Sequence, residues 1–199
     1  MQAYFQGRID NFCAVYAVLN ALQVLFGLPP LAARRIYNRT LVRESADPEG
    51  FRRVLEHRTD YVRLVDGMLD DVRAHEFPGL RVEAPFSEGA PCGHVWEALR
   101  GAASPPIPRI SVFRFLRFSS GSERPYVDHW TTGHYMDGEG LHLLDCSLEP
   151  GALYSIPFSI VTDRDRPMRR DYVVIPPESV RILSAAASAA MPMRYGFNN

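Results

Sequence analysis

The stretch from Phe12 to Phe26 is apolar on almost every side of a helix, and this feature constrains the fold more than any other part of the sequence. Only Asn20 and Gln23 interrupt it. Such a helix needs neighbours around most of its circumference, because apolar surface left in water is unfavourable. Gly27, followed by two prolines, is typical of a helix C-terminus. The sequence therefore predicts one central helix with the rest of the chain packed around it.

The remaining patterns place helices early in the chain and strands late. We expect helices over 12–26, 31–38 and 92–99, one or two amphipathic helices within 51–74, and a turn at 47–50. Strands are expected over 110–118, 127–136, 141–145, 172–175 and 180–183, with a turn at 137–140. Helices followed by strands favour an α+β fold with an antiparallel sheet over a parallel α/β fold.

The length of 199 residues suits one domain. We expect a single domain over 1–184, with a helical part over about 1–105 and a sheet part over about 106–184. The small and polar residues of 185–199 predict a mobile tail. We find neither an apolar run long enough to span a membrane nor a basic segment leading into an apolar one at the N-terminus, so we expect a cytoplasmic protein with no membrane partner.

Charge and residue usage narrow the possible partners. The formal net charge is −1, so no basic field would hold nucleic acid. Three cysteines are an odd and small number, which favours free thiols in a reducing compartment. All 22 basic residues are arginine. Either a GC-rich genome or avoidance of ubiquitin-like conjugation, which needs a lysine amine, explains this composition.

Cys13 opens the predicted central helix. Backbone N–H groups of a first helical turn lack partners within the helix, and the helix dipole is positive there. Both effects favour the thiolate, which is the nucleophilic form of cysteine. A small buried apolar residue is the alternative interpretation of Cys13 on position alone.

His129 and Asp145 flank the turn at 137–140 on two strands expected to pair. Side chains alternate along a strand, so the register decides whether the two residues share a face. A two-residue loop would pair Asp145 with Thr132, on the wrong face. A three-residue loop or a β-bulge would pair Asp145 with Thr131 and leave His129 as its diagonal neighbour. A functional pair therefore requires one of these two irregularities.

Together these residues form a candidate triad. A cysteine attacks a carbonyl, a histidine transfers the proton, and an acidic group fixes the imidazole tautomer. Cys13, His129 and Asp145 fit these three roles. The backbone N–H of Cys13 and the side-chain amide of Gln6 are the candidate oxyanion donors.

The sequence from Gln6 to Leu22 resembles the start of papain-like cysteine peptidases, in particular the bacterial double-glycine leader peptidases and the Josephin deubiquitinases. The pair Cys13-Ala14, the pair His129-Trp130 and the run 143–148 (LLDCSL) resemble the Josephin pattern. The resemblance covers roughly residues 4–25 and 126–150. It implies a papain-like fold, hydrolysis of a peptide or isopeptide bond without cofactor or metal, and a peptide or ubiquitin-like protein as substrate.

Two other functions use the same residues differently. A deamidase or a transglutaminase-like acyltransferase has the same triad and differs in acyl acceptor and pocket shape. A degenerate papain-like domain would instead bind a peptide or a ubiquitin-like protein without cleaving it. The oligomeric state is left open by the sequence.

The other cysteines and histidines have either a functional or a purely structural interpretation. Cys92, close to His94, is a rival nucleophile, although residues two apart on a helix face different directions. Cys146 would point away from the Asp145 face if the strand continued, and we expect it to be a packed residue. No Cys-x-x-Cys or His-Glu-x-x-His spacing is present, so the sequence predicts no metal site.

Overall fold

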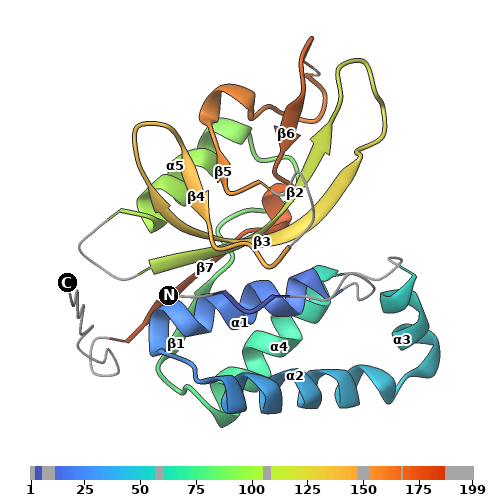
Figure 1. Cartoon of the computed structure of the whole chain (residues 1–199), viewed down its shortest axis with the longest axis vertical. Helices are drawn as coiled ribbons and strands as arrows, with labels where there is room; N and C mark the ends of the chain where they lie inside the picture. Colours follow the sequence, from blue (N-terminus) through green and yellow to red (C-terminus); the bar gives the residue numbers. More distant parts are fainter. Residues whose placement is uncertain are drawn as a thin grey trace.

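The computed structural model describes residues 3–5, 12–56, 61–104, 109–147, 153–166 and 168–186. Within these ranges lie five α-helices and a seven-stranded sheet (Figure 1). The helices are α1 (Cys13–Phe26), α2 (Pro30–Ser45), α3 (Pro48–Leu55), α4 (Tyr61–His75) and α5 (Cys92–Ala102). The strands are β1 (Leu80–Glu83), β2 (Arg109–Phe118), β3 (Val127–Met136), β4 (Leu141–Leu143), β5 (Ser155–Ile156), β6 (Tyr172–Val174) and β7 (Arg181–Ala185). The predicted α+β class is confirmed.

The sheet is built from antiparallel ladders in the order β1-β7-β2-β3-β4-β5, and β6 pairs with the far end of β2. The long strands β2 and β3 form its centre. Their register places Phe115 opposite His129 and Arg114 opposite Trp130. Because directly opposite residues share a face, His129 lies on the Phe115 face of the sheet.

Helices cover the sheet from two sides. Helices α1 and α4 lie beneath it with α2 and α3 beyond them, whereas α5 lies on the other side (Figure 1). One core joins the apolar residues of α1 and α4 to Ile110, Val112 and Trp130 of the sheet. A second core joins α5 to Phe113 and Phe115. The two cores fix the sheet as a central layer between the helices.

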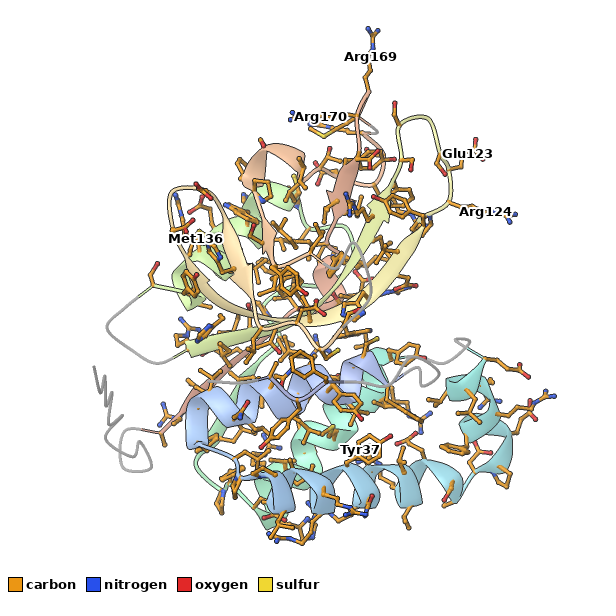
Figure 2. The ribbon with its side chains drawn as sticks, in the orientation of Figure 1. Tyr37, Glu123, Arg124, Met136, Arg169 and Arg170 are labelled. Carbon is orange, nitrogen blue, oxygen red and sulfur yellow. The ribbon has the colours of Figure 1, made fainter. Side chains whose placement is uncertain are left out.

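Helix α1 is enclosed as its sequence predicts. Ten of its fourteen residues are buried. Gly27 ends it with φ of 65°, a left-handed conformation that glycine adopts without steric cost, and its N–H donates to the Gln23 carbonyl. Tyr37 of α2 contributes to the enclosure, since its ring packs 5.9 Å from that of Phe12 and 5.7 Å from that of Tyr16 (Figure 2).

Some element boundaries differ from the prediction. Helix α2 continues to Ser45 rather than ending near Asn38, because Arg39 pairs with Asp71 and Glu76 and so holds this helix to α4 and the residue after it. The segment 47–50, predicted as a turn, instead opens α3, with Pro48 at its first position, where a missing N–H costs nothing. Strand β4 stops at Leu143 rather than at 145.

Two short strands, β1 and β5, were not predicted at all. Each is defined by pairing with a segment distant in sequence, β7 for the first and β4 for the second. Of the predicted tail, residues 187–199 lie outside the described residues, and β7 extends to Ala185. Across the described ranges, no helix combines the length and apolarity needed to cross a membrane.

Candidate active site

A β-bulge sets the register of the β3–β4 hairpin. Met136 pairs with Leu141 across a four-residue turn, but Gly133 pairs with Leu143, so the ladder shifts by one residue at His134. The N–H of Leu144 then donates to the carbonyl of Thr132 at 2.9 Å. The next residue, Asp145, therefore lies opposite Thr131. The bulge required by the sequence argument is present, and without it Asp145 would face the other way.

The bulge brings Asp145 to His129. Nε2 of His129 lies 3.0 Å from Oδ1 of Asp145. The Thr131 hydroxyl donates to Oδ2 at 3.0 Å, and the backbone N–H of Ser147 donates to Oδ1 at 2.6 Å. The Asp145 side chain is 1% exposed, so these hydrogen bonds replace the water that its carboxylate loses. The ring of Phe115 packs edge-on at 5.6 Å and limits rotation of the imidazole.

Helix α1 is joined to the hairpin at successive turns of one face. The Thr132 hydroxyl donates to the carbonyl of Ala17 at 2.7 Å. One turn further along, the Asn20 amide contacts the carbonyl of Leu144 at 3.5 Å and that of Tyr4 at 3.2 Å. Cys13 lies one turn before Ala17, and four- and three-residue steps keep all three positions on the same side of a helix. These contacts hold the first residue of α1 against the hairpin, and they pair the buried side-chain amide of Asn20 with backbone carbonyls.

The pKa of His129 depends on three neighbouring side chains, one of which is that of Cys13. Burial alone would lower the pKa of His129, because a buried imidazolium loses hydration. Hydrogen bonds with the side chains of Asp145, Cys13 and Cys146 outweigh this effect and raise the pKa to about 12. The ring is thus held in its protonated form at neutral pH. Since Nε2 faces Asp145, Nδ1 is the nitrogen that remains for proton exchange with a thiol.

Cys146 lies where the sequence did not place it. It is packed, as expected, with 1% exposure. The expectation that it points away from the site is wrong, because β4 ends at Leu143 and the chain no longer alternates as a strand. Its sulfur lies 3.9 Å from Nε2 of His129 and 3.9 Å from the carbonyl oxygen of Cys13. Burial raises the pKa of Cys146 to about 11, so it is a neutral thiol at pH 7.

The rival nucleophile Cys92 has a different environment. It opens α5, and its backbone N–H donates to Oδ1 of Asp163 at 2.6 Å. Burial, followed by the charge of Asp163, raises the pKa of Cys92 above its ordinary value, which disfavours the thiolate. The backbone N–H of Gly93 and the charge of Arg166 lower this pKa, but they do not offset the burial and the charge of Asp163.

Gln6, the predicted second oxyanion donor, lies outside the described residues. Two residues earlier, the N–H of Tyr4 donates to Asn20 at 2.6 Å, which ties the start of the chain to α1. The oxyanion role of Gln6 stays a prediction from the sequence.

One pocket is lined by the start of α5, by Arg114 of β2 and by residues 162–166, and it contains none of the candidate triad residues. It has a volume of about 620 Å³ and is lined by Arg114, Cys92, Asp163 and Glu178 among others. The hydrogen bond with Asp128 is the main cause that raises the pKa of Arg114, and the charge of Cys13 raises it further. Arg114 is therefore a wall of the pocket within electrostatic reach of Cys13.

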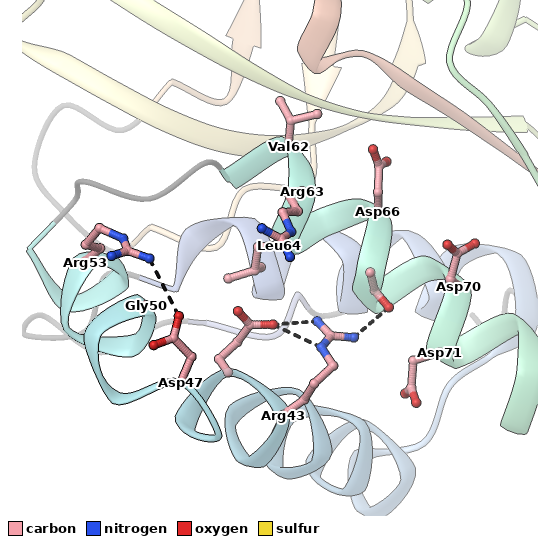
Figure 3. Close-up of a pocket in the computed structure, with 12 residues that line it drawn as sticks. Arg43, Asp47, Gly50, Arg53, Val62, Arg63, Leu64, Asp66, Asp70 and Asp71 are labelled. Carbon is pink, nitrogen blue, oxygen red and sulfur yellow. Dashed lines mark hydrogen bonds and ion pairs between the residues drawn. The ribbon is translucent and has the colours of Figure 1, made fainter.

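A larger pocket of about 990 Å³ lies between α2, α3 and α4, and it contains none of the candidate triad residues. Figure 3 shows Arg43 crossing it from α2 to the backbone of α4, where it donates to the Gly67 carbonyl at 2.6 Å. Charged side chains paired with one another line much of this space, including Arg53 with Asp47. We assign no chemistry to this pocket.

Comparison of the chain with known protein families, curated proteins and solved structures finds no match. The chemistry of the site therefore has to be argued from its own geometry. That geometry is a histidine fixed by a buried carboxylate, and a cysteine at the N-terminus of α1 is among the side chains that raise the pKa of this histidine.

Proposed function

We propose that this protein is a papain-like cysteine peptidase or isopeptidase in which Cys13 is the nucleophile, His129 transfers protons and Asp145 orients His129. One observation carries the proposal: the imidazole of His129 is fixed by a hydrogen bond to the buried carboxylate of Asp145, and the side chain of Cys13 is among the groups that raise its pKa. A fixed imidazole next to a thiol at a helix N-terminus is the arrangement that stabilises a thiolate.

The reaction follows from these positions. The Cys13 thiolate attacks a carbonyl carbon, and the imidazolium of His129 gives its proton to the departing amine. The resulting thioester is attacked by water, whose proton His129 accepts, and the acid leaves as Cys13 regains its thiolate. The first-turn N–H groups of α1 offer hydrogen bonds to the oxyanion.

The substrate class rests on the resemblance and on composition. Of the two branches that the sequence resembles, one removes peptide leaders and the other cleaves ubiquitin from lysine. The absence of lysine removes every side-chain amine that an isopeptide bond could join, which favours an isopeptide substrate for a protein acting beside such conjugates.

The test is hydrolysis of fluorogenic amides made from short peptides and from ubiquitin-like C-terminal tails. Activity of the full chain that Cys13→Ala abolishes and Cys92→Ala leaves unchanged would support the proposal. Tail binding by both the native chain and Cys13→Ala, without turnover of any substrate, would replace it with the binding-module function. Transfer of the acyl group to an added amine would assign an acyltransferase.

A further inference from the structure

Cys146 has no part in the proposed triad, yet its thiol is buried against it. Its sulfur, Nε2 of His129 and a carboxylate oxygen of Asp145 all lie within 4.8 Å of one another. Within the residues that the structure describes, this is the one cluster of three such side chains close enough to share an ion. The sequence alone did not indicate this cluster, because its three donors follow no metal-binding spacing. Asp145 and Cys146 come close to His129 only through the bulged hairpin.

We propose that His129, Asp145 and Cys146 form a binding site for a thiophilic divalent cation of the zinc type. Zinc binds imidazole nitrogen and carboxylate oxygen at about 2.0–2.2 Å and thiolate sulfur at about 2.3 Å, which puts tetrahedral donors roughly 3.3–3.6 Å apart. The Nε2–Oδ1 distance of 3.0 Å and the Nε2–Sγ distance of 3.9 Å are close to these values. Small side-chain shifts complete the site.

Charge and the surrounding hydrogen bonds suit such an ion. A thiolate, a carboxylate and a neutral imidazole carry two negative charges together, so a divalent cation makes the buried cluster neutral. On binding, the ion displaces two protons to water, the one on Nε2 of His129 and the one on the Cys146 thiol. Thr131 and the backbone N–H of Ser147 already hold the Asp145 carboxylate in place. Partners of this kind orient metal ligands and strengthen binding.

The site excludes hard cations by its chemistry. Magnesium and calcium prefer six or more oxygen ligands, whereas this cluster offers one carboxylate, one nitrogen and one sulfur. Three protein ligands leave a fourth tetrahedral position for water. Cys13 is outside the set of three donors whose ligand atoms lie within 4.8 Å of one another.

Metal binding would switch off the proposed triad, a consequence that rests on the proposed function. An imidazole bound through Nε2 is neutral and carries its proton on Nδ1, so it can neither pair with a thiolate as imidazolium nor accept a further proton. The ion would therefore act as an inhibitor that competes with the Asp145–His129 hydrogen bond and not as a cofactor.

Cobalt(II) titration of the full-length reduced protein tests the site itself, because a thiolate-bound cobalt ion gives a charge-transfer band in the near ultraviolet. We expect one ion per chain, displaced by zinc and not by magnesium. Cys13→Ser and Cys92→Ser should keep the band. Cys146→Ser should abolish it, and His129→Gln should weaken binding by about 100-fold or more.

Absence of any band, or a band lost in Cys13→Ser but kept in Cys146→Ser, would overturn the proposal. Circular dichroism confirms folding, and Cys146→Ala replaces the serine variant if that variant unfolds.

Alkylation of Cys13 with and without zinc then tests the inhibition separately. If cobalt binds but zinc does not change this alkylation rate, the metal site stands and the proposed inhibition is refuted. Cobalt binding is expected even if the protein cleaves no substrate, so failure of the proposed function does not refute the site.

Discussion

Nε2 of His129 lies 3.0 Å from Oδ1 of Asp145 although the two residues are sixteen positions apart in sequence. A regular hairpin through the same four-residue turn would place Thr132 opposite Asp145 and turn the carboxylate to the other face. The shift at His134 corrects this by one residue. The bulge thus links the path of the backbone to the chemistry of the site.

A one-residue insertion tests this dependence. An alanine inserted between His142 and Leu143 should move Asp145 out of register with Thr131, because each added residue reverses the face of the following side chains. We expect the alkylation rate of Cys13 to fall by about 100-fold, the lower end of what a positioned general base contributes. An alanine inserted between Gly138 and Glu139 lengthens only the turn and should leave the rate unchanged. Equal losses in both variants would contradict the register argument.

Removal of the carboxylate should cost both reactivity and stability. In Asp145→Ala the buried Thr131 hydroxyl and the half-buried Ser147 N–H lose their acceptor, which costs about 1–3 kcal/mol of unfolding free energy. The imidazole loses its orientation, so Cys13 should react more slowly. Asp137→Ala is the matched control, since its carboxylate is in the exposed turn and, among the described residues, bonds to Glu139, Gly140 and His142. Urea denaturation and alkylation measure the two effects, and an Asp145→Ala variant as reactive as the native chain would refute the orienting role.

The ion pair between Arg181 and Asp66 joins the sheet to the helical layer. The Arg181 guanidinium is 6% exposed and binds both carboxylate oxygens of Asp66, at 2.6 and 2.8 Å. Asp66→Ala would leave a buried cation without its counter-ion, so we expect a loss of about 3 kcal/mol of unfolding free energy. Asp70→Ala, on the exposed face of the same helix, should cost under about 1 kcal/mol. Similar losses in both variants would show that the pair does not hold the layers together.

The bulge residue His134 should make stability depend on pH. Burial lowers the pKa of His134, and the charge of His142 lowers it further. The unfolded chain therefore binds more protons as the pH falls through about 6.5, and stability present above that value is lost on acidification towards the lower folded pKa. Between pH 8 and pH 5, the melting temperature of the native chain should fall further than that of His134→Gln. The difference between the two decreases should be about 1–2 °C. An identical fall would contradict this assignment.

The sequence predicted the elements that a local pattern defines. A few neighbouring residues are enough to recognise the apolar run of α1, the alternation of β2 and β3, and the turn at 137–140. Strands β1 and β5 do not, because four and two residues form a strand only when a distant partner supplies the ladder. The same reason explains α2, whose last turns depend on the pairing of Arg39 with Asp71.

The candidate site was predictable up to one residue. The sequence argument brought His129 and Asp145 together on condition of an irregular hairpin, and the structure supplies that irregularity. It misplaced Cys146, because nothing local shows that pairing stops at Leu143. The roles of Cys13, His129, Asp145 and Gln6 in catalysis stay predictions that geometry supports only for the first three.

The central claim is that His129 activates Cys13, and alkylation by iodoacetamide at slightly acidic pH tests it most directly. Mass spectrometry follows each cysteine in the native chain and in His129→Ala, with circular dichroism as the folding control. We predict that Cys13 reacts at least about tenfold faster than Cys92 in the native chain and that His129→Ala removes this difference. A Cys13 that reacts no faster than Cys92, or one whose rate does not change in His129→Ala, would contradict the account.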